Sequence, residues 1–312
     1  MSKRRSRSDG LLIGLATTVA ALLTVPGTVI AQALPPTTVD PVVVEGARLR
    51  DLVEQFVDDV IEPPVRRGPA RWARRVCVGA VNLRQDVAQA LVDQVSEVAR
   101  RVDLEVGEPG CRPNILIIGA DDGAALARGL VERRPRLFRP GYSGASRSRL
   151  ALERFTTTPA PVRWWHVSLP VNRDTGAPAV RMPGGAPPMI VTRGRLRTNI
   201  TNTLQRVVIV VDVDAASGLN TVQLGDYIGV VALAQVDPDA ETSAYDTILN
   251  LFEMEPRPSG MTDWDTAYLS ALYEAELDQS GPPSQRREIV DRMLRDRARA
   301  TGLEDAVPGL DD

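Results

Sequence analysis

Few residue types in this chain of 312 residues can do covalent or metal chemistry, and their scarcity excludes several classes of enzyme. Lysine occurs once, at Lys3, and histidine once, at His166. Lys3 falls within residues 1–33, which are described below as a secretory signal. The rest of the chain therefore has no lysine for a Schiff base, a serine–lysine pair or a phosphate-binding loop. A single histidine also cannot form the H-E-x-x-H zinc motif.

The two cysteines, Cys77 and Cys111, are expected to be structural. The secretory signal in residues 1–33, described below, predicts export, and an oxidising compartment favours a disulfide over two free thiols. No base adjacent in sequence would activate either thiol as a nucleophile. We therefore predict a Cys77–Cys111 bond, which on chain-entropy grounds contributes about 3 to 4 kcal/mol.

Two carboxylates, Asp212 and Asp214, end an apolar run and point to the same side of a predicted strand. That arrangement could serve a paired-carboxylate or calcium site. The glycine that follows is one position late for a calcium loop, and no bidentate Glu follows at the required distance. We favour a turn and helix-capping role.

Three further candidate binding residues, Arg163, Trp164 and His166, lie in one apolar segment. A Ser-His-Asp arrangement that uses His166 stays open, although no local signature selects its partners. A lone histidine beside tryptophans is more often a packed core residue.

No cofactor or metal is expected. Zinc sites commonly combine three or four Cys, His or carboxylate ligands, whereas this chain has one histidine and two cysteines assigned to a disulfide. The acidic turn Gly119–Gly123 lacks the pattern of a phosphate loop, and Asp121 or Asp122 is expected to cap the helix that follows.

These candidates are organised around the stretch Arg206–Val236. The β-branched run Val207–Val211 predicts a strand covered on both faces, and the apolar pattern over 221–236 predicts a buried central helix. Upstream, a strand at Val76–Val81, an amphipathic helix at Val87–Val102 and a strand at Asn114–Ile118 predict a βαβ unit. Its parallel strands would bring the two cysteines together.

The remaining patterns complete the fold. A strand is expected at Val162–Leu169, ended by Pro170, and residues 171–205 should form a long excursion with a short hairpin in which Arg193, Arg195 and Arg197 alternate. Short helical patterns then follow, with a capping-box start at Thr262 and a last helix over Ser284–Ala300.

The predicted fold class is α/β (α+β), with a mixed sheet, a βαβ unit in the N-terminal half and a mainly helical C-terminal half around a buried central helix. We expect one domain over residues 71–300. Residues 34–70 should form an extended leader, through residue 48, and a first helix at Leu49–Ile61; residues 301–312 should form a flexible acidic tail.

Residues 1–33 have the three parts of a secretory signal: a basic start, an apolar run at Leu11–Val25 and the small-x-small site Ala31–Ala33. We predict cleavage near Ala33 and a periplasmic or secreted protein without stable membrane insertion. An uncleaved anchor is the alternative, but the run is shorter than the roughly 20 residues of a spanning helix. Cleavage shifts the net charge from -3 to about -6, which argues against nucleic-acid binding.

Four segments resemble a family of uncharacterised exported bacterial proteins: Val76–Leu83, Glu108–Asn114, Pro161–Pro170 and Gly225–Asp237. The likeness covers most of the mature chain and implies export and a single folded unit, without an activity. More distantly, the order of strand 206–214 and helix 221–236 is similar to zincin-like metallopeptidases. The helix lacks their histidine ligands and glutamate, so this resemblance implies a scaffold without the zinc site.

The sequence leaves open whether the chain is an enzyme and favours a non-catalytic binding or envelope-interaction module, with an envelope protein or glycan as partner. The alternatives are a metal-independent hydrolase of envelope peptide or glycan and a degenerate zincin-like peptidase. A serine beside His166, or two carboxylates facing each other in a pocket, would favour an enzyme.

Overall fold

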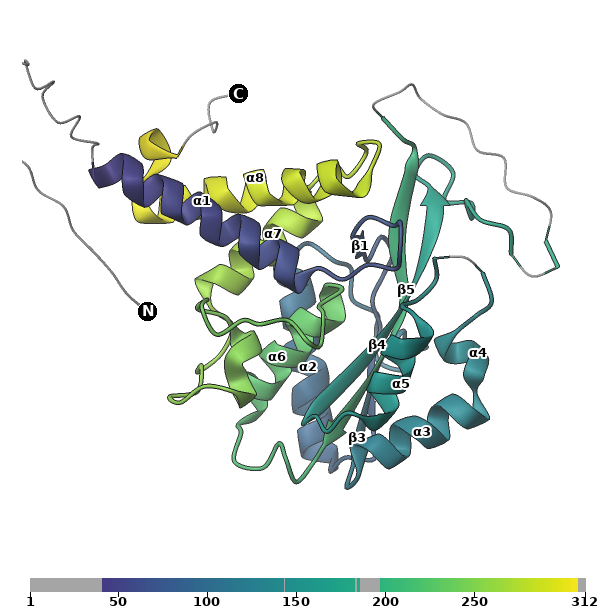
Figure 1. Cartoon of the computed structure of the whole chain (residues 1–312). Coiled ribbons are helices and arrows are strands. Elements are labelled where there is room, and N and C mark those ends of the chain that lie inside the picture. Colours follow the sequence, from purple (N-terminus) through teal and green to yellow (C-terminus); the bar gives the residue numbers. More distant parts are fainter. Residues whose placement is uncertain (1–40, 143, 183, 186–196, 308–312) are drawn as a thin grey trace, which may run out of the picture. The chain divides into compact units, whose positions relative to one another are not determined.

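A mixed sheet of five strands forms the centre of the fold (Figure 1). The computed structural model describes residues 41–307, apart from 143, 183 and 186–196. The strands are β1 (Ala70–Arg71), β2 (Val78–Val81), β3 (Ile115–Ala120), β4 (Val162–Asn172) and β5 (Ile200–Asp212). The predicted mixed α/β class is confirmed.

Strand β5 has neighbours along both of its sides. On one side β3 pairs with residues 207–212 and β1 with residues 202–203, both parallel; on the other side β4 runs antiparallel. Strand β2 lies beyond β3 and pairs with it in parallel. The run Val207–Val211 is buried throughout, as predicted for a strand covered on both faces.

The predicted βαβ unit is confirmed as β2, α2 (Gln85–Arg101) and β3, with the disulfide at its base. Cys77 and Cys111 are bonded, with their Cα atoms 6.1 Å apart. Cys77 directly precedes β2, and Cys111 lies shortly before β3. Because parallel strands begin at the same edge of a sheet, the topology brings the two cysteines together.

Helices cover both faces of the sheet (Figure 1). The α-helices are α1 (Pro41–Val60), α2 (Gln85–Arg101), α3 (Gly123–Arg133), α4 (Pro135–Phe138), α5 (Arg149–Thr157), α6 (Thr221–Leu233), α7 (Asp263–Glu274) and α8 (Pro282–Thr301), and the 3₁₀ helices are η1 (Ile248–Phe252) and η2 (Glu304–Ala306). Helices α3, α4 and α5 enclose a small core around Trp165, while α2 and α6 lie on the other face with α1, α7 and α8 beyond them.

Helix α6 is the predicted buried central helix, and every residue from Leu224 to Leu233 is buried. A capping box formed by Asn220 and Gln223 starts it. Two glycines let α2 approach closely, because a Cβ at Gly225 or Gly229 would come within 3.0 Å of side-chain atoms of α2. The helix ends at Leu233, three residues earlier than expected.

Two boundaries set by prolines were predicted wrongly. Helix α1 begins at Pro41, so residues 41–48 are helical rather than extended; a proline fits the first position of a helix, where its missing N–H would have no partner. Strand β4 continues through Pro170 to Asn172. It tolerates the proline because β4 is an edge strand, and the Pro170 carbonyl accepts a hydrogen bond from Ala179 outside the β4–β5 ladder.

The C-terminal segment packs further than expected. Ala306 and Val307 are buried, so the packed chain extends to Val307, beyond the boundary predicted at residue 300. Residues 308–312 of the predicted tail lie outside the described residues, as do Arg193 and Arg195 of the predicted hairpin. Arg197 is described, and it forms an ion pair with Asp278 at 2.5 Å.

Candidate binding site

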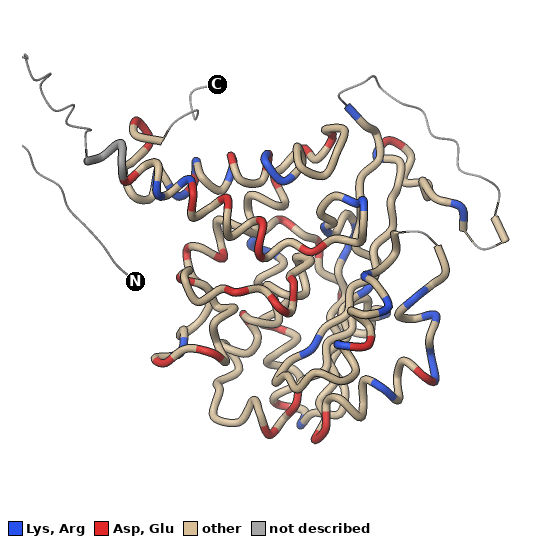
Figure 2. The backbone as a smooth tube through the Cα atoms, in the orientation of Figure 1, with Lys and Arg blue, Asp and Glu red and all other residues tan. Residues whose placement is uncertain are grey.

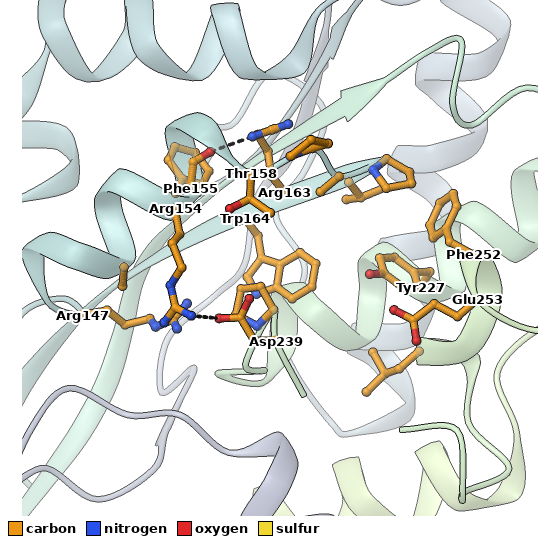
Figure 3. Close-up of a pocket in the computed structure, with 17 residues that line it drawn as sticks. Arg147, Arg154, Phe155, Thr158, Arg163, Trp164, Tyr227, Asp239, Phe252 and Glu253 are labelled. Atoms are coloured by element: carbon orange, nitrogen blue, oxygen red, sulfur yellow. Dashed lines mark hydrogen bonds and ion pairs between the residues drawn. The ribbon is translucent and has the colours of Figure 1, made fainter. Parts of the chain in front are cut away.

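A pocket of about 190 Å³ opens beside the start of β4, between α5, α6 and η1 (Figure 3). Trp164, Tyr227 and Phe252 line its aromatic part. Three prolines, Pro159, Pro161 and Pro238, line it as well, together with arginines and carboxylates described below.

The aromatic rings form a packed floor rather than a flat exposed platform. Trp164 and Tyr227 meet edge to face with ring centroids 6.1 Å apart, and Tyr227 and Phe252 meet in the same way at 5.2 Å. Only 6% of Trp164 and 7% of Tyr227 is exposed. The Trp164 indole N–H donates to the carbonyl of Val236 at 2.9 Å, so this donor is already used within the protein.

Local sequence explains how α5 and β4 form one wall. Ser148 caps α5 by accepting a hydrogen bond from the backbone N–H of Ala151, and Phe155 lies one turn further on the same face. The segment Thr158–Pro161 then connects α5 to β4, and its two prolines keep the chain extended. Arg163 donates to the carbonyl of Phe155 at 2.8 Å, which holds the start of β4 against α5.

Two of the three arginines that line the pocket are compensated by carboxylates, whereas the third, Arg163, donates to a backbone carbonyl. Arg154 forms an ion pair with Asp239 at 2.6 Å, and both side chains are nearly half exposed (Figure 3). Arg147 is only 12% exposed and pairs with Glu62 and with Asp237, the latter at 3.2 Å. This second cluster ties the chain after α1 to the chain after α6.

Burial changes the proton affinity of two groups around the pocket. The pKa of Glu62 is raised to about 7, mainly by burial and by its hydrogen bond to Asp237, while Arg147 acts in the opposite direction. Burial raises the pKa of Tyr227 as well, so its hydroxyl stays protonated and can donate a hydrogen bond to a ligand.

Two of the candidates predicted from the sequence, Arg163 and Trp164, line this pocket. His166 does not. It is 5% exposed and its Nε2 lies 2.7 Å from the carbonyl oxygen of Val231 on α6. Burial lowers the pKa of His166 to about 4 and keeps the ring neutral at pH 7, the behaviour of a packed core histidine.

Asp212 is the last residue of β5, and Asp214 lies in the turn that follows, where its backbone carbonyl accepts a hydrogen bond from Ser217. Asp212 accepts hydrogen bonds from the backbone N–H of Ala215 at 3.1 Å and of Gly123 at 3.5 Å. The first contact holds the turn after β5, and the second connects that turn to the start of α3. Asp122 caps α3, as predicted for one of the two aspartates of that turn.

Within the described part of the chain, no group of three or more His, Cys, Asp and Glu side chains is arranged to hold a metal ion. Across the same residues, none of the helices combines the length and apolar character needed to cross a membrane.

Sequence reasoning missed Tyr227, Asp239, Phe252 and Glu253 as pocket residues. Tyr227 and Phe252 belong to apolar helical patterns, which indicate core and do not distinguish a residue that also lines a cavity. Asp239 and Glu253 stand in polar connections without a motif. Only the packing of α6, η1 and their connections against β4 brings the four together.

No protein-family profile, curated protein or solved structure matches this chain.

Proposed function

We propose that this chain is an exported, non-catalytic binding protein, and that the pocket beside β4 receives one apolar side chain of an envelope peptide or protein. The observation that carries the proposal is the buried aromatic floor. A cavity of about 150 Å³ can hold a benzene ring, so the volume suits a single aromatic or branched aliphatic side chain. The compartment rests on the secretory pattern of residues 1–33, and the Cys77–Cys111 bond agrees with it.

The floor suits a side chain better than a sugar ring. Carbohydrate sites commonly use an exposed flat ring together with several free hydrogen-bonding groups, whereas Trp164 is nearly buried and its N–H is used. The rim can fix the peptide that carries the side chain. Thr158 and Glu253 line the mouth, and the Arg154–Asp239 pair is exposed enough to exchange partners with a bound peptide.

A blocking variant tests the site. The probe is N-acetyl-phenylalaninamide, titrated into ¹⁵N-labelled protein while the tryptophan indole resonances are followed by NMR. We expect saturable shifts at Trp164, and Thr158→Trp should weaken the binding at least tenfold because the new ring fills the mouth. Thr157→Trp is the matched control, since Thr157 is exposed beside it but does not line the pocket.

The same titration separates the peptide from a glycan. N-acetylglucosamine should produce no saturable shift at the same resonances. Binding of the sugar without binding of the phenylalanine derivative would replace the proposed ligand class, and unchanged binding in Thr158→Trp would place the site elsewhere.

A hydrolase is the second candidate, because two carboxylates, Asp239 and Glu253, line the same pocket (Figure 3). Acid–base pairs of this kind cleave glycosidic bonds. Neither carboxylate is buried, and Asp239 is paired with Arg154, so the arrangement favours binding. Dye-labelled peptidoglycan should release no dye; release that Glu253→Gln abolishes would establish the hydrolase instead.

Mass analysis of the purified protein tests export. The mature chain should begin at Leu34, and an intact Met1 in membrane fractions would contradict cleavage near Ala33.

A further inference from the structure

Two adjoining cavities along the first half of β5 carry seven arginines. The first cavity, about 320 Å³, is lined by Arg71, Arg74 and Arg173. The second, about 560 Å³, is lined by Arg133, Arg134, Arg136 and Arg206. Leu169 and Gln205 line both cavities, so the two adjoin each other, and we call them together the arginine groove.

An irregularity in the sheet joins the cavities. Val167 of β4 pairs with Arg206, but the next residue, Ser168, pairs with Leu204, so Gln205 is an extra residue in β5. Such a bulge locally bends a strand and changes the direction of its side chains. Here it places Gln205 at the junction, with Arg206 on the side of α4.

The groove has no compensating charge of its own. None of its described lining residues is Asp or Glu. Arg173 lies 3.9 Å from Asp278, and among the described residues the other six arginines have no carboxylate within ion-pair distance. Burial lowers the pKa of Arg71; Tyr273 acts in the opposite direction, and the charges of Arg173 and Arg292 lower the pKa further. Figure 2 shows basic residues gathered along α3 and α4 with few acidic ones between them.

Several of these guanidinium groups are already held in place by backbone carbonyls. Arg71 donates to Leu272 at 2.7 Å, Arg173 to Glu276 at 3.3 Å and Arg206 to Leu137 at 3.2 Å. A positioned guanidinium loses less side-chain entropy when it binds an anion, and its planar fork matches phosphate and carboxylate oxygens.

The first cavity also contains a polar group that lacks a partner. Asn202 is 9% exposed and donates to the carbonyl of Gly68 at 3.2 Å, but its Oδ1 accepts no hydrogen bond. Buried acceptors are normally satisfied, so this unpaired oxygen is an exception among the residues that line the cavity.

We propose that the arginine groove binds a linear polyanion of the envelope, a polymer with regularly spaced phosphodiester or carboxylate groups. Arginines of the two cavities would engage successive charges along the polymer. Apolar residues between them, such as Pro140 and Met182, would contact its uncharged links. Tyr142 is the aromatic residue in the lining, whereas sites for single-stranded nucleic acid commonly stack successive bases on several aromatic rings.

The test uses the mature chain and linear sodium polyphosphate, with orthophosphate as the small-anion comparison, in calorimetric titrations over a series of salt concentrations. Polyphosphate should bind at least tenfold more tightly per phosphate than orthophosphate. The double variant Arg74→Gln/Arg136→Gln, with one change in each cavity, should weaken polyphosphate binding at least tenfold. For single-stranded nucleic acid, each lost phosphate contact reduces the steepness of log K against log salt by about 0.7. On the same basis, the double variant should reduce the steepness by about 1.4.

The matched control is Arg287→Gln/Arg299→Gln on α8, which removes the same charge from two other exposed arginines. It should leave the binding within twofold of the unaltered protein, and so should Thr158→Trp, because the pocket beside β4 is a separate site. Each single groove variant should weaken binding, since both cavities contribute.

Four results would overturn the proposal. Equal affinity per phosphate for polyphosphate and orthophosphate would show isolated anion sites, and an equal loss in the α8 control would show a general charge effect. An effect of only one single groove variant would show that the cavities do not act together. Tighter binding of single-stranded DNA than of polyphosphate would assign the groove to nucleic acid instead.

Discussion

The pocket beside β4 and the arginine groove both contain arginines, but most arginines of the pocket have a carboxylate partner and most of those in the groove do not. In the pocket, two of the three arginines, Arg147 and Arg154, have a carboxylate partner supplied by another segment, and Arg163 donates to a backbone carbonyl. In the groove, six of seven arginines have no such partner among the described residues. The comparison separates cations that hold segments of the fold together from cations that are available to a ligand.

The difference has a physical basis in how charge is compensated. A partly buried guanidinium needs an anion or carbonyl acceptors because the low dielectric leaves an unpaired charge costly; Arg147 has carboxylates, and Arg71 and Arg163 have backbone carbonyls. The exposed guanidinium groups of the groove, such as those of Arg74 and Arg136, are solvated, so clustering them costs mainly mutual repulsion, which a bound polyanion would remove. Changes on the pocket side should therefore alter stability and its dependence on pH, while changes in the groove should alter binding.

The largest expected change in the free energy of unfolding concerns His166, which is buried in the core. Its pKa is about 4 when folded and about 6.5 when unfolded, so both states are neutral above pH 6.5. As the pH falls from 6.5 to 4, the unfolded chain binds a proton that the folded protein excludes. This lowers the free energy of unfolding by up to about 3 kcal/mol.

Urea denaturation at pH 7.5 and pH 4.5 measures this effect. The variant His166→Gln keeps an N–H donor near the Val231 carbonyl. Between pH 7.5 and pH 4.5, its free energy of unfolding should fall by about 2 kcal/mol less than that of the unaltered protein. The same loss in both proteins would show that His166 does not carry this pH dependence.

A smaller effect is expected from Arg147→Gln, which leaves Glu62 and Asp237 close together without their cation. The free energy of unfolding at pH 7 should fall by about 2 kcal/mol. In the groove, the control Arg136→Gln should change it by less than about 0.5 kcal/mol. Similar losses at both positions would remove the distinction between paired and unpaired arginines.

The smallest expected change in the free energy of unfolding concerns Glu62. Its folded pKa of about 7 exceeds the ordinary 4.5, so its contribution to stability is fully present below pH 4.5 and is lost as the pH rises through 7. Glu62→Gln should therefore be more stable than the unaltered protein by about 1 kcal/mol at pH 8, after allowance for solvent exposure, with little difference at pH 5. Thermal unfolding at the two pH values measures this, and a constant difference would contradict the assignment.

The sequence determined those features whose causes lie within one element or one turn. The β-branched run Val207–Val211 specified a strand covered on both faces, because such side chains suit a pleated and fully buried surface. The capping box at Thr262 specified the start of α7, since its hydrogen bonds close within three residues. The βαβ pattern specified which two strand starts meet, and with them the disulfide.

Only the tertiary structure decided which of these elements enclose the two cavities. Pro170 could continue β4 because that strand lies at the edge of the sheet, a position that no local pattern reveals. The pocket joins Arg163 and Trp164 to side chains of α5, α6 and η1, and the groove depends on a bulge at Gln205 that exists only in the pairing of β4 with β5. Periodicity records which side of an element is buried, whereas a cavity depends on side chains from distant segments that fail to fill the space between them.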